Sequence, residues 1–282
     1  MYGILGSALA NKVPTAVAYD PRSIPDSTWG FCCENEPTAH IEDMFKLWLD
    51  PDYRDNNPSA PTHQQASRWF ADYMRHLHGY LQTFFSSSFP RWDTRRVEFL
   101  FSVPTTWRSP AMIARLERLI REAGFGQQEN HSARISLTEA EAAAVWVAKQ
   151  TYKKDDVYLI CDAGGGTTDV NILKVGSTDH TELLQLSSVE GAVIGSAMID
   201  FKIQRVIETR LQLISHLIQG EVQVVAETML KGRFDTFKCS FGSAASNVQK
   251  LPLPVPGLNA GQAFPQSAIE DGKMIITRHV PS

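Results

Sequence analysis

One run of eight residues restricts what this chain can fold into more than any other feature. It reads Asp162-Ala-Gly-Gly-Gly-Thr-Thr-Asp169, and strand-like apolar segments, Val157 to Cys161 and Val170 to Val175, lie on either side of it. Glycines have no Cβ, so they can adopt positive φ and let backbone N–H groups approach an anion closely. The pattern predicts a strand, an anion-binding turn and a second strand.

The residues beside the glycines indicate which anion would bind. Thr167 can donate its hydroxyl to a phosphate, whereas Asp162 and Asp169 would repel one unless a cation lies between them. Mg²⁺, held through waters, is the cation that this arrangement predicts. The predicted metal residues are therefore Asp162 and Asp169. The predicted phosphate-binding residues are Gly164, Gly165, Gly166 and Thr167.

Other glycine motifs fit this run less well. A Walker loop requires a lysine after its last glycine, and no such run occurs in the chain. A dinucleotide-binding glycine motif opens a helix, but a β-type run follows Asp169. The remaining alternative is a tight hairpin whose glycines serve geometry alone.

Composition narrows the class of protein. The 282 residues allow one large or two medium domains, and with a net charge of −4 no basic excess points to nucleic acid. No apolar run approaches the roughly 18–20 residues that span a bilayer. The four cysteines lack zinc-ligand spacing, and we expect reduced thiols in a cytoplasmic protein. The N-terminus lacks a basic region, so it is interpreted as an ordinary segment and not as a signal peptide.

Periodicity and capping residues predict an alternation of helices and strands. Helices are expected over 62–85, 109–123, 138–152, 195–217 and 221–237. Strands are expected over 13–19, 29–33, 97–103, 134–137, 157–161, 170–175, 183–189 and 273–277, and a loop over 243–268. The charged break at 153–156 is the predicted boundary between two lobes, 1–153 and 154–282.

The glycine turn resembles the second phosphate loop of the actin, sugar-kinase and seventy-kilodalton heat-shock ATPase superfamily. The heat-shock branch fits best, because two of its other motifs have counterparts in the same order. Phe101-Ser-Val-Pro-Thr-Thr-Trp107 resembles its strand ending in Val-Pro, and Leu137-Thr-Glu-Ala-Glu-Ala-Ala-Ala144 resembles its Asn-Glu-Pro-Thr-Ala-Ala-Ala helix start. Ile194-Gly-Ser-Ala-Met-Ile-Asp-Phe201 matches a later helix start more loosely. The implied fold is α/β, two-lobed and actin-like, with ribonuclease-H-like lobes.

The resemblance also implies roles for single residues. Lys46 would reach the γ-phosphate and the attacking water, and Glu139 would face the waters of the metal. Gly195 and Ser196 would lie near the nucleotide, and Pro104 would couple the nucleotide to a partner domain. The implied catalytic set is Lys46, Glu139, Asp162 and Asp169. The alternatives are plainer: Glu139 as a carboxylate favoured at a helix N-terminus, Lys46 as a solvated lysine and Pro104 as a strand end.

The chain departs from the family pattern in three motifs. Ala140 and Glu141 replace the Pro-Thr of the helix start, and Ala197 replaces an acidic residue after the glycine pair. Met112 stands where a basic residue is expected, with Arg108 nearby. These differences indicate a divergent member of the family.

Two family segments have no clear counterpart. The first phosphate hairpin, Asp-x-Gly-Thr-Thr, would lie just before Met1, and the adenosine loop is matched only superficially by residues 241–247. We therefore expect a fold truncated at the N-terminus and in its second lobe, with an unpaired strand edge in lobe I. Lobe II would hold the second phosphate loop, its helices and the start of a IIB-like subdomain.

The function that these observations predict is Mg²⁺-dependent binding of ATP or ADP by a heat-shock-70-like protein, with chaperone-type activity toward protein clients or with co-chaperones. Whether the chain hydrolyses ATP stays open, and ATP binding by this chain alone is expected to be weak. Two alternatives stay open as well. One is a truncated or degenerate, non-catalytic relative that acts as an interaction module. The other is a small-molecule kinase of the same superfamily.

Overall fold

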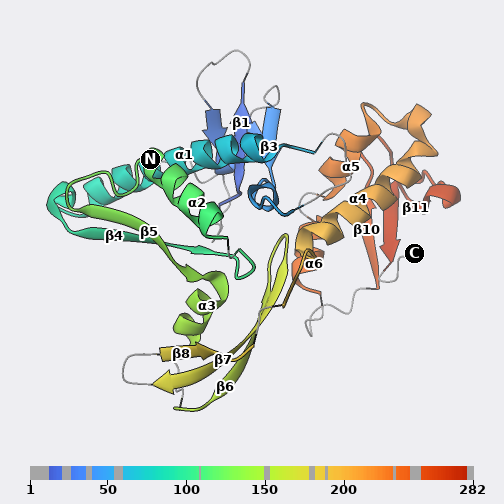
Figure 1. The fold of residues 1–282 in the computed structure, drawn as a ribbon. Helices are drawn as coiled ribbons and strands as arrows, with labels where there is room; N and C mark the ends of the chain where they lie inside the picture. The colour runs from blue at the N-terminus through green and yellow to red at the C-terminus, as the bar shows by residue number, and fades with distance from the viewer. Residues whose placement is uncertain are drawn as a thin grey trace. The chain divides into compact units, whose positions relative to one another are not determined.

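The chain is a mixed α/β protein that divides into two compact units, Met1–Val193 and Ile194–Ser282 (Figure 1). The computed structural model describes residues 13–20, 27–35, 40–53, 60–107, 109–148, 153–177, 182–187, 190–230, 233–241 and 249–277. No helix within these ranges is both long enough and apolar enough to cross a membrane. The predicted lobe boundary near residue 153 stays a prediction.

The first sheet of the N-terminal unit is antiparallel. Its central strand β1 (Ala16–Tyr19) pairs with β2 (Ser27–Trp29) and β3 (His40–Asp43). The predicted strand at 29–33 is wrong beyond Trp29. Gly30 has a φ of +59°, a conformation that favours glycine, and the chain turns there into the 3₁₀-helix η1 (Gly30–Asn35).

A long helix, α1 (His63–Ser88), begins at the predicted residue. The backbone N–H of Gln65 donates to the Thr62 hydroxyl, and the Gln65 side chain accepts from the Thr62 N–H, which completes a capping box. The buried side of α1 includes Trp69 and Met74. Trp69 packs in one cluster with Phe45 and Leu49, so α1 anchors the segment that carries Lys46.

A parallel βαβ unit follows α1. Strand β4 (Val97–Val103) pairs with β5 (His131–Thr138), and α2 (Pro110–Glu122) connects them. The helix begins at its predicted cap, where the Ser109 side chain accepts from the N–H of Met112, and it ends before Gly124, whose φ is +114°. The side chains of β4 alternate between partly buried and exposed, and the last of them, Val103, is buried.

His78 of α1 packs against Phe125, which follows α2, with ring centroids 4.9 Å apart. Burial lowers the pKa of His78, and the neighbouring His131 lowers it further. Because the folded pKa lies below the ordinary value of about 6.5, the unfolded chain takes up a proton first. The contribution of neutral His78 to stability is therefore fully present above about pH 6.5. It is lost as the pH falls through that value toward the folded pKa.

We expect the urea concentration at the unfolding midpoint of the N-terminal unit to decrease when the pH is lowered from 7.5 to 5.5. The decrease should be smaller in His78→Gln. Tryptophan fluorescence measures this unit alone, because all six tryptophans lie between Trp29 and Trp146. His216→Gln, at an exposed histidine of the C-terminal unit, is the control and should leave the pH dependence of the N-terminal unit as in the wild type. An unchanged slope in His78→Gln would contradict the assignment.

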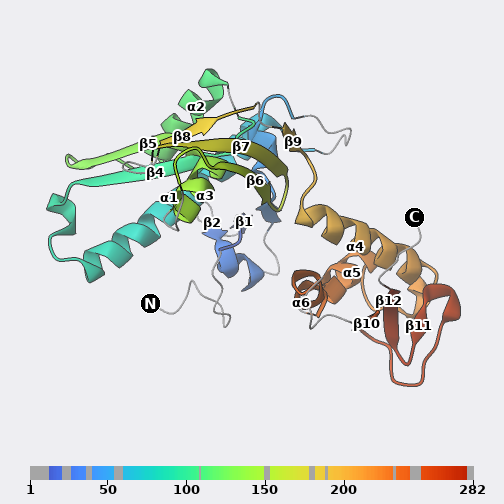
Figure 2. The ribbon, with the colours of Figure 1, turned by 90° about the horizontal axis from the view of Figure 1, so that it is seen from below.

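The third sheet of the N-terminal unit carries the glycine turn (Figure 2). Helix α3 (Glu139–Ala148) leads toward it, and the antiparallel strands β6 (Val157–Ala163) and β7 (Thr168–Ser177) enclose the turn. Strands β8 (Glu182–Gln185) and β9 (Glu190–Ala192) both pair with β7. Every second residue of β7 from Asp169 to Val175 is buried, so one face of this strand packs inward.

The C-terminal unit combines three helices with a small antiparallel sheet. The helices are α4 (Ser196–Gln212), α5 (Val222–Leu230) and α6 (Arg233–Cys239). The strands are β10 (Lys250–Pro254), β11 (Ile269–Glu270) and β12 (Lys273–Thr277), in the order β10-β12-β11. Their buried side chains form one core with those of α4 and α5, including Ile207, Leu211, Leu253 and Met274.

Three predictions for this unit need correction. The helix expected over 221–237 is two helices, and the last turn of the helix expected over 195–217 is the separate 3₁₀-helix η4 (Ser215–Leu217). The loop expected over 243–268 contains β10, although Pro252 and Pro254 lack an N–H donor. β10 tolerates them because it lies at the sheet edge and pairs on one side only.

Candidate functional site

The predicted strand-turn-strand geometry is confirmed at residues 162–169. The backbone N–H of Gly164 donates to the Thr167 carbonyl over 2.8 Å and closes the turn. Asp162 and Asp169 are direct partners across the β6–β7 pair, so their carboxylates stand on the same face of the sheet. Like charges placed directly opposite are destabilising, and a cation between them would relieve the repulsion.

The three glycines do not use the conformation expected of them. Positive φ occurs at seven other described glycines, but not at Gly164, Gly165 or Gly166. A Cβ on Gly164 would lie 3.2 Å from the Thr167 carbonyl, and one on Gly166 would lie 3.2 Å from a Leu47 methyl group. A Cβ on Gly165 would have no neighbour within 4 Å. Packing thus explains two of the glycines, whereas Gly165 borders open space.

That open space is a pocket of about 420 Å³ in the N-terminal unit. Its wall comes from segments far apart in the chain, and it contains seven of the ten predicted site residues. These are Lys46, Glu139, Asp162, Gly164, Gly165, Gly166 and Thr167. Pro104 and Trp107 line it as well. Trp107 was not predicted from the sequence as a site residue, although it closes the segment that resembles the Val-Pro motif.

Lys46 and Glu139 form an ion pair at the pocket wall, with 2.6 Å between Nζ and Oε1. Lys46 precedes the 3₁₀-helix η2 (Leu47–Leu49), and Glu139 is the first residue of α3. Glu141, not Glu139, forms the capping box, because its side chain accepts from the backbone N–H of Thr138. Glu139 is therefore not the residue that caps the helix, and its carboxylate contacts the lysine instead.

Asp169 is buried, with 4% of its surface exposed. Thr167 donates its hydroxyl to Oδ2 over 3.3 Å, whereas Oδ1 has no hydrogen-bond partner in the described part of the chain. Burial raises the pKa of the Asp169 carboxyl, and the charge of Asp162 raises it further. Asp169 does not line the pocket, so its carboxylate would not contact a ligand there directly.

Gly191 of β9 explains how Asp169 is enclosed. The two residues are partners across the β7–β9 pair, and a Cβ on Gly191 would collide with Oδ1 of Asp169 and with the Thr106 side chain. Only glycine leaves room for the carboxylate there. The sequence signal for this position is a single glycine, which gives no indication of its partner.

The metal prediction can be tested against the donors present. No group of three or more His, Cys, Asp or Glu residues that could hold a metal occurs within the described ranges. Mg²⁺ commonly binds through one or two carboxylates plus waters and substrate phosphates. Asp162, which lines the pocket, fits that mode of binding, in which the phosphate supplies the missing ligands. Asp169 does not line the pocket, so it could take part only through waters.

Gly195 and Ser196 belong to the C-terminal unit. Gly195 is the N-cap of α4 and has extended backbone with a φ of −140°, and Ser196 begins the helix. Their predicted position near the nucleotide stays a prediction. The segment 241–247 superficially resembles an adenosine loop, and all of it except Phe241 lies outside the described residues. Arg108 lies outside them as well.

Comparison with known proteins gives limited matches. No protein-family model matches the chain, and no curated protein matches it. One similar solved structure is the crystal structure of MreB5 of Spiroplasma citri bound to ADP, with 16% sequence identity and a TM-score of 0.48. The match covers 87% of this chain and 62% of the other, so the chain spans less than two thirds of that structure.

Proposed function

We propose that this protein binds the phosphates of ATP or ADP, with Mg²⁺, in the pocket at the glycine turn. The observation that carries the proposal is Gly165, whose missing side chain is required neither by its φ nor by its neighbours but leaves the pocket open. Backbone N–H groups of such a turn can bind an anion without net positive charge. Lys46, whose side chain is half exposed at the same wall, supplies a cationic group.

Mg²⁺ would be held by Asp162 and, through waters, by Asp169. When bound with the nucleotide, the ion neutralises phosphate charge beside these two carboxylates. Lys46 then has the role of orienting the terminal phosphate, and Glu139 that of holding Lys46 in place and accepting a proton from a bound water. These roles assign ATP hydrolysis to the same pocket.

The broader assignment is to the two-lobed actin-like ATPases, and within them to a divergent heat-shock-70 branch. Its support is the order of three motifs along the chain, together with the confirmed strand-turn-strand geometry. Action in the cytoplasm with protein clients or co-chaperones follows from that assignment and belongs to the same proposal.

A calorimetric titration with ATP tests the proposal directly. We expect saturable binding in the presence of Mg²⁺, and affinity at least about tenfold lower when EDTA replaces the metal or when Asp162 is changed to asparagine. The physical reason is that EDTA removes the cation that separates carboxylate from phosphate, whereas Asp162→Asn removes the carboxylate that holds this cation.

Asp93→Asn, at an exposed aspartate of the 3₁₀-helix η3 (Trp92–Thr94), is the matched control and should bind like the wild type. The proposal is wrong if the wild type shows no saturable binding. Equal affinity with Mg²⁺ and with EDTA would also reject it, because a carboxylate-held cation would then have no part in binding.

A further inference from the structure

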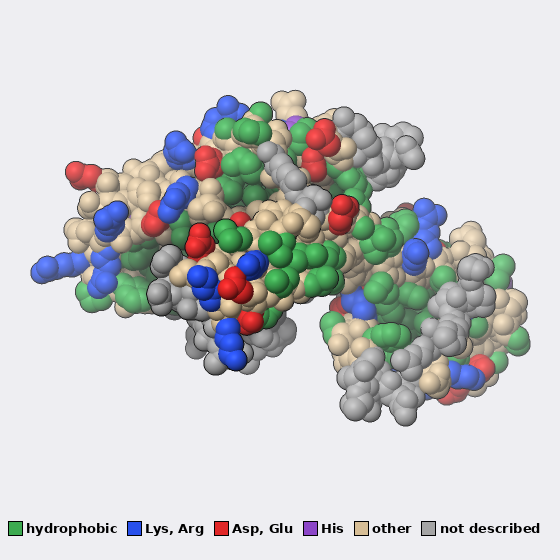
Figure 3. Space-filling view, turned by 60° about the horizontal axis from the view of Figure 1, so that its bottom comes forward, with side chains coloured by type: hydrophobic (Ala, Val, Ile, Leu, Met, Phe, Trp, Pro, Cys, Tyr) green, Lys and Arg blue, Asp and Glu red, His purple; other side chains and the backbone are tan. Residues whose placement is uncertain are grey.

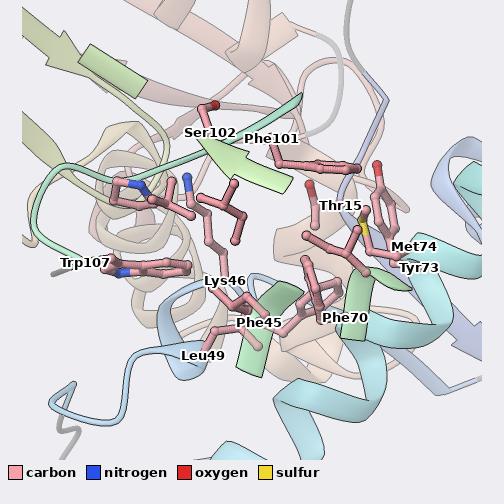
Figure 4. Close-up of a pocket in the computed structure, with 15 residues that line it drawn as sticks. Thr15, Phe45, Lys46, Leu49, Phe70, Tyr73, Met74, Phe101, Ser102 and Trp107 are labelled. Carbon is pink, nitrogen blue, oxygen red and sulfur yellow. The ribbon is translucent and has the colours of Figure 1, made fainter. Parts of the chain in front are cut away.

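A second cavity in the N-terminal unit differs in character from the pocket at the glycine turn (Figure 4). It measures about 200 Å³ and lies between α1, the C-terminal end of β4, α2 and residues 45–49. Its lining is mainly apolar and aromatic, and includes Phe45, Phe70, Met74, Phe101, Val103 and Leu116.

The base of this cavity is rigid, and its rim is polar. Phe45, Leu49 and Leu116 are at most 2% exposed, so packing on their other sides fixes their positions. Two polar residues of the lining, Thr15 and Lys46, are exposed instead. The cavity therefore offers an apolar interior to one end of a ligand and hydrogen-bond donors to the other.

The size and lining indicate which ligand would fit. Wall atoms beside a void lack the dispersion contacts that a filled core provides, so an apolar guest gains them on entry. An engineered apolar cavity of about 150 Å³ binds benzene, so this one accommodates about one aromatic ring. Phe70 and Phe101 offer edge-to-face partners to such a ring, and Met74 offers a sulfur contact.

Figure 4 shows Lys46 and Trp107 across the cavity from Phe70, Tyr73 and Met74 of α1. The Lys46 ammonium has three donors, of which Glu139 takes one. We propose that this cavity binds a small aromatic acid, with its ring among the α1 side chains and its carboxylate at Lys46. Thr15, Lys46, Pro104 and Trp107 line both cavities, so the ligand would lie next to the pocket at the glycine turn.

Phenylacetate is the probe for the first experiment. Titration into protein labelled with ¹³C at its methionine methyl groups should move the Met74 signal saturably, and Met74→Leu assigns that signal among the seven methionines. Acetate, which carries the anion without the ring, should leave the Met74 signal in place. Equal effects of acetate and phenylacetate, or no saturable shift with either, would overturn the proposal.

Two isoleucines of the same unit provide a matched pair of variants. Ile135 lines the cavity, whereas Ile113 packs on the same hydrophobic cluster but outside the lining. Ile135→Phe fills space that the ring needs, so phenylacetate affinity should fall at least about tenfold, and Ile113→Phe should change it less than about twofold. Equal affinities of the two folded variants would contradict the cavity as the binding site.

A further variant keeps the test decisive if Ile135→Phe does not fold. Lys46→Met, at a side chain that is 50% exposed, should weaken phenylacetate binding but leave toluene binding unchanged. Equal losses for both probes, or for neither, would refute the assigned orientation. Asp162→Asn should bind phenylacetate like the wild type, which separates this inference from nucleotide binding at the turn.

Discussion

Replacing Gly165 by valine will lower the affinity for Mg²⁺-ATP at least about tenfold while leaving the stability of the fold within about 0.5 kcal/mol of the wild type. The two expectations have one cause. The backbone at Gly165 is not in the left-handed region, and a Cβ there meets nothing within 4 Å. The new side chain is therefore tolerated by the protein, but it projects into the space assigned to phosphate.

Calorimetry measures the affinity, and urea unfolding followed by tryptophan fluorescence measures the stability. The matched control is Gly79→Val in α1, because a Cβ on Gly79 also has no neighbour within 4 Å. It should leave nucleotide affinity unchanged. Wild-type affinity in Gly165→Val would show that phosphate does not approach this part of the turn.

The largest effect on stability is expected from Phe125→Ala, which should lower the free energy of unfolding of the N-terminal unit by about 3–5 kcal/mol. Phe125 is 1% exposed, and its ring meets Phe99 and Phe101 edge-on, with centroids 5.1 and 5.2 Å away. Truncation removes these contacts and leaves a cavity between α2 and the β4–β5 pair.

Phe84→Ala in α1 is the comparison, because this ring is 43% exposed. It should cost less than about half as much as Phe125→Ala, since nearly half of the Phe84 surface stays in water in the folded chain. Similar losses in the two variants would mean that the packing around Phe125 does not determine the stability of the unit.

The parts of the fold that could be predicted from the sequence depend on contacts close along the chain. Helices α1 and α2 begin at Thr62 and Ser109 because each side chain caps a backbone N–H within three residues. Strand β10 was missed because its prolines argue against a strand, and only pairing with β12, about twenty residues further on, reveals it.

The candidate site also has parts that can be predicted from neighbouring residues in the sequence and parts that only the fold reveals. The turn follows from eight consecutive residues, and it is found where it was predicted. Lys46 and Glu139 were identified separately, by resemblance, but their ion pair joins residues that are 93 positions apart, and only the fold brings them together. The burial of Asp169 behind Gly191 has no local signal at all, because the contact depends on the pairing of β7 with β9.

Because the carboxylates of Asp162 and Asp169 face each other, the stability of the folded state depends on whether a cation or ligand is bound there. Without a cation, the β6–β7 pair carries two like charges at its turn, and one of them is buried with an unsatisfied oxygen. A ligand that binds only the folded chain stabilises it by about 2.7 kcal/mol at a hundred times its dissociation constant. The stability of this sheet would then rise and fall with the supply of Mg²⁺-nucleotide, so that the ligand acts as a component of the fold.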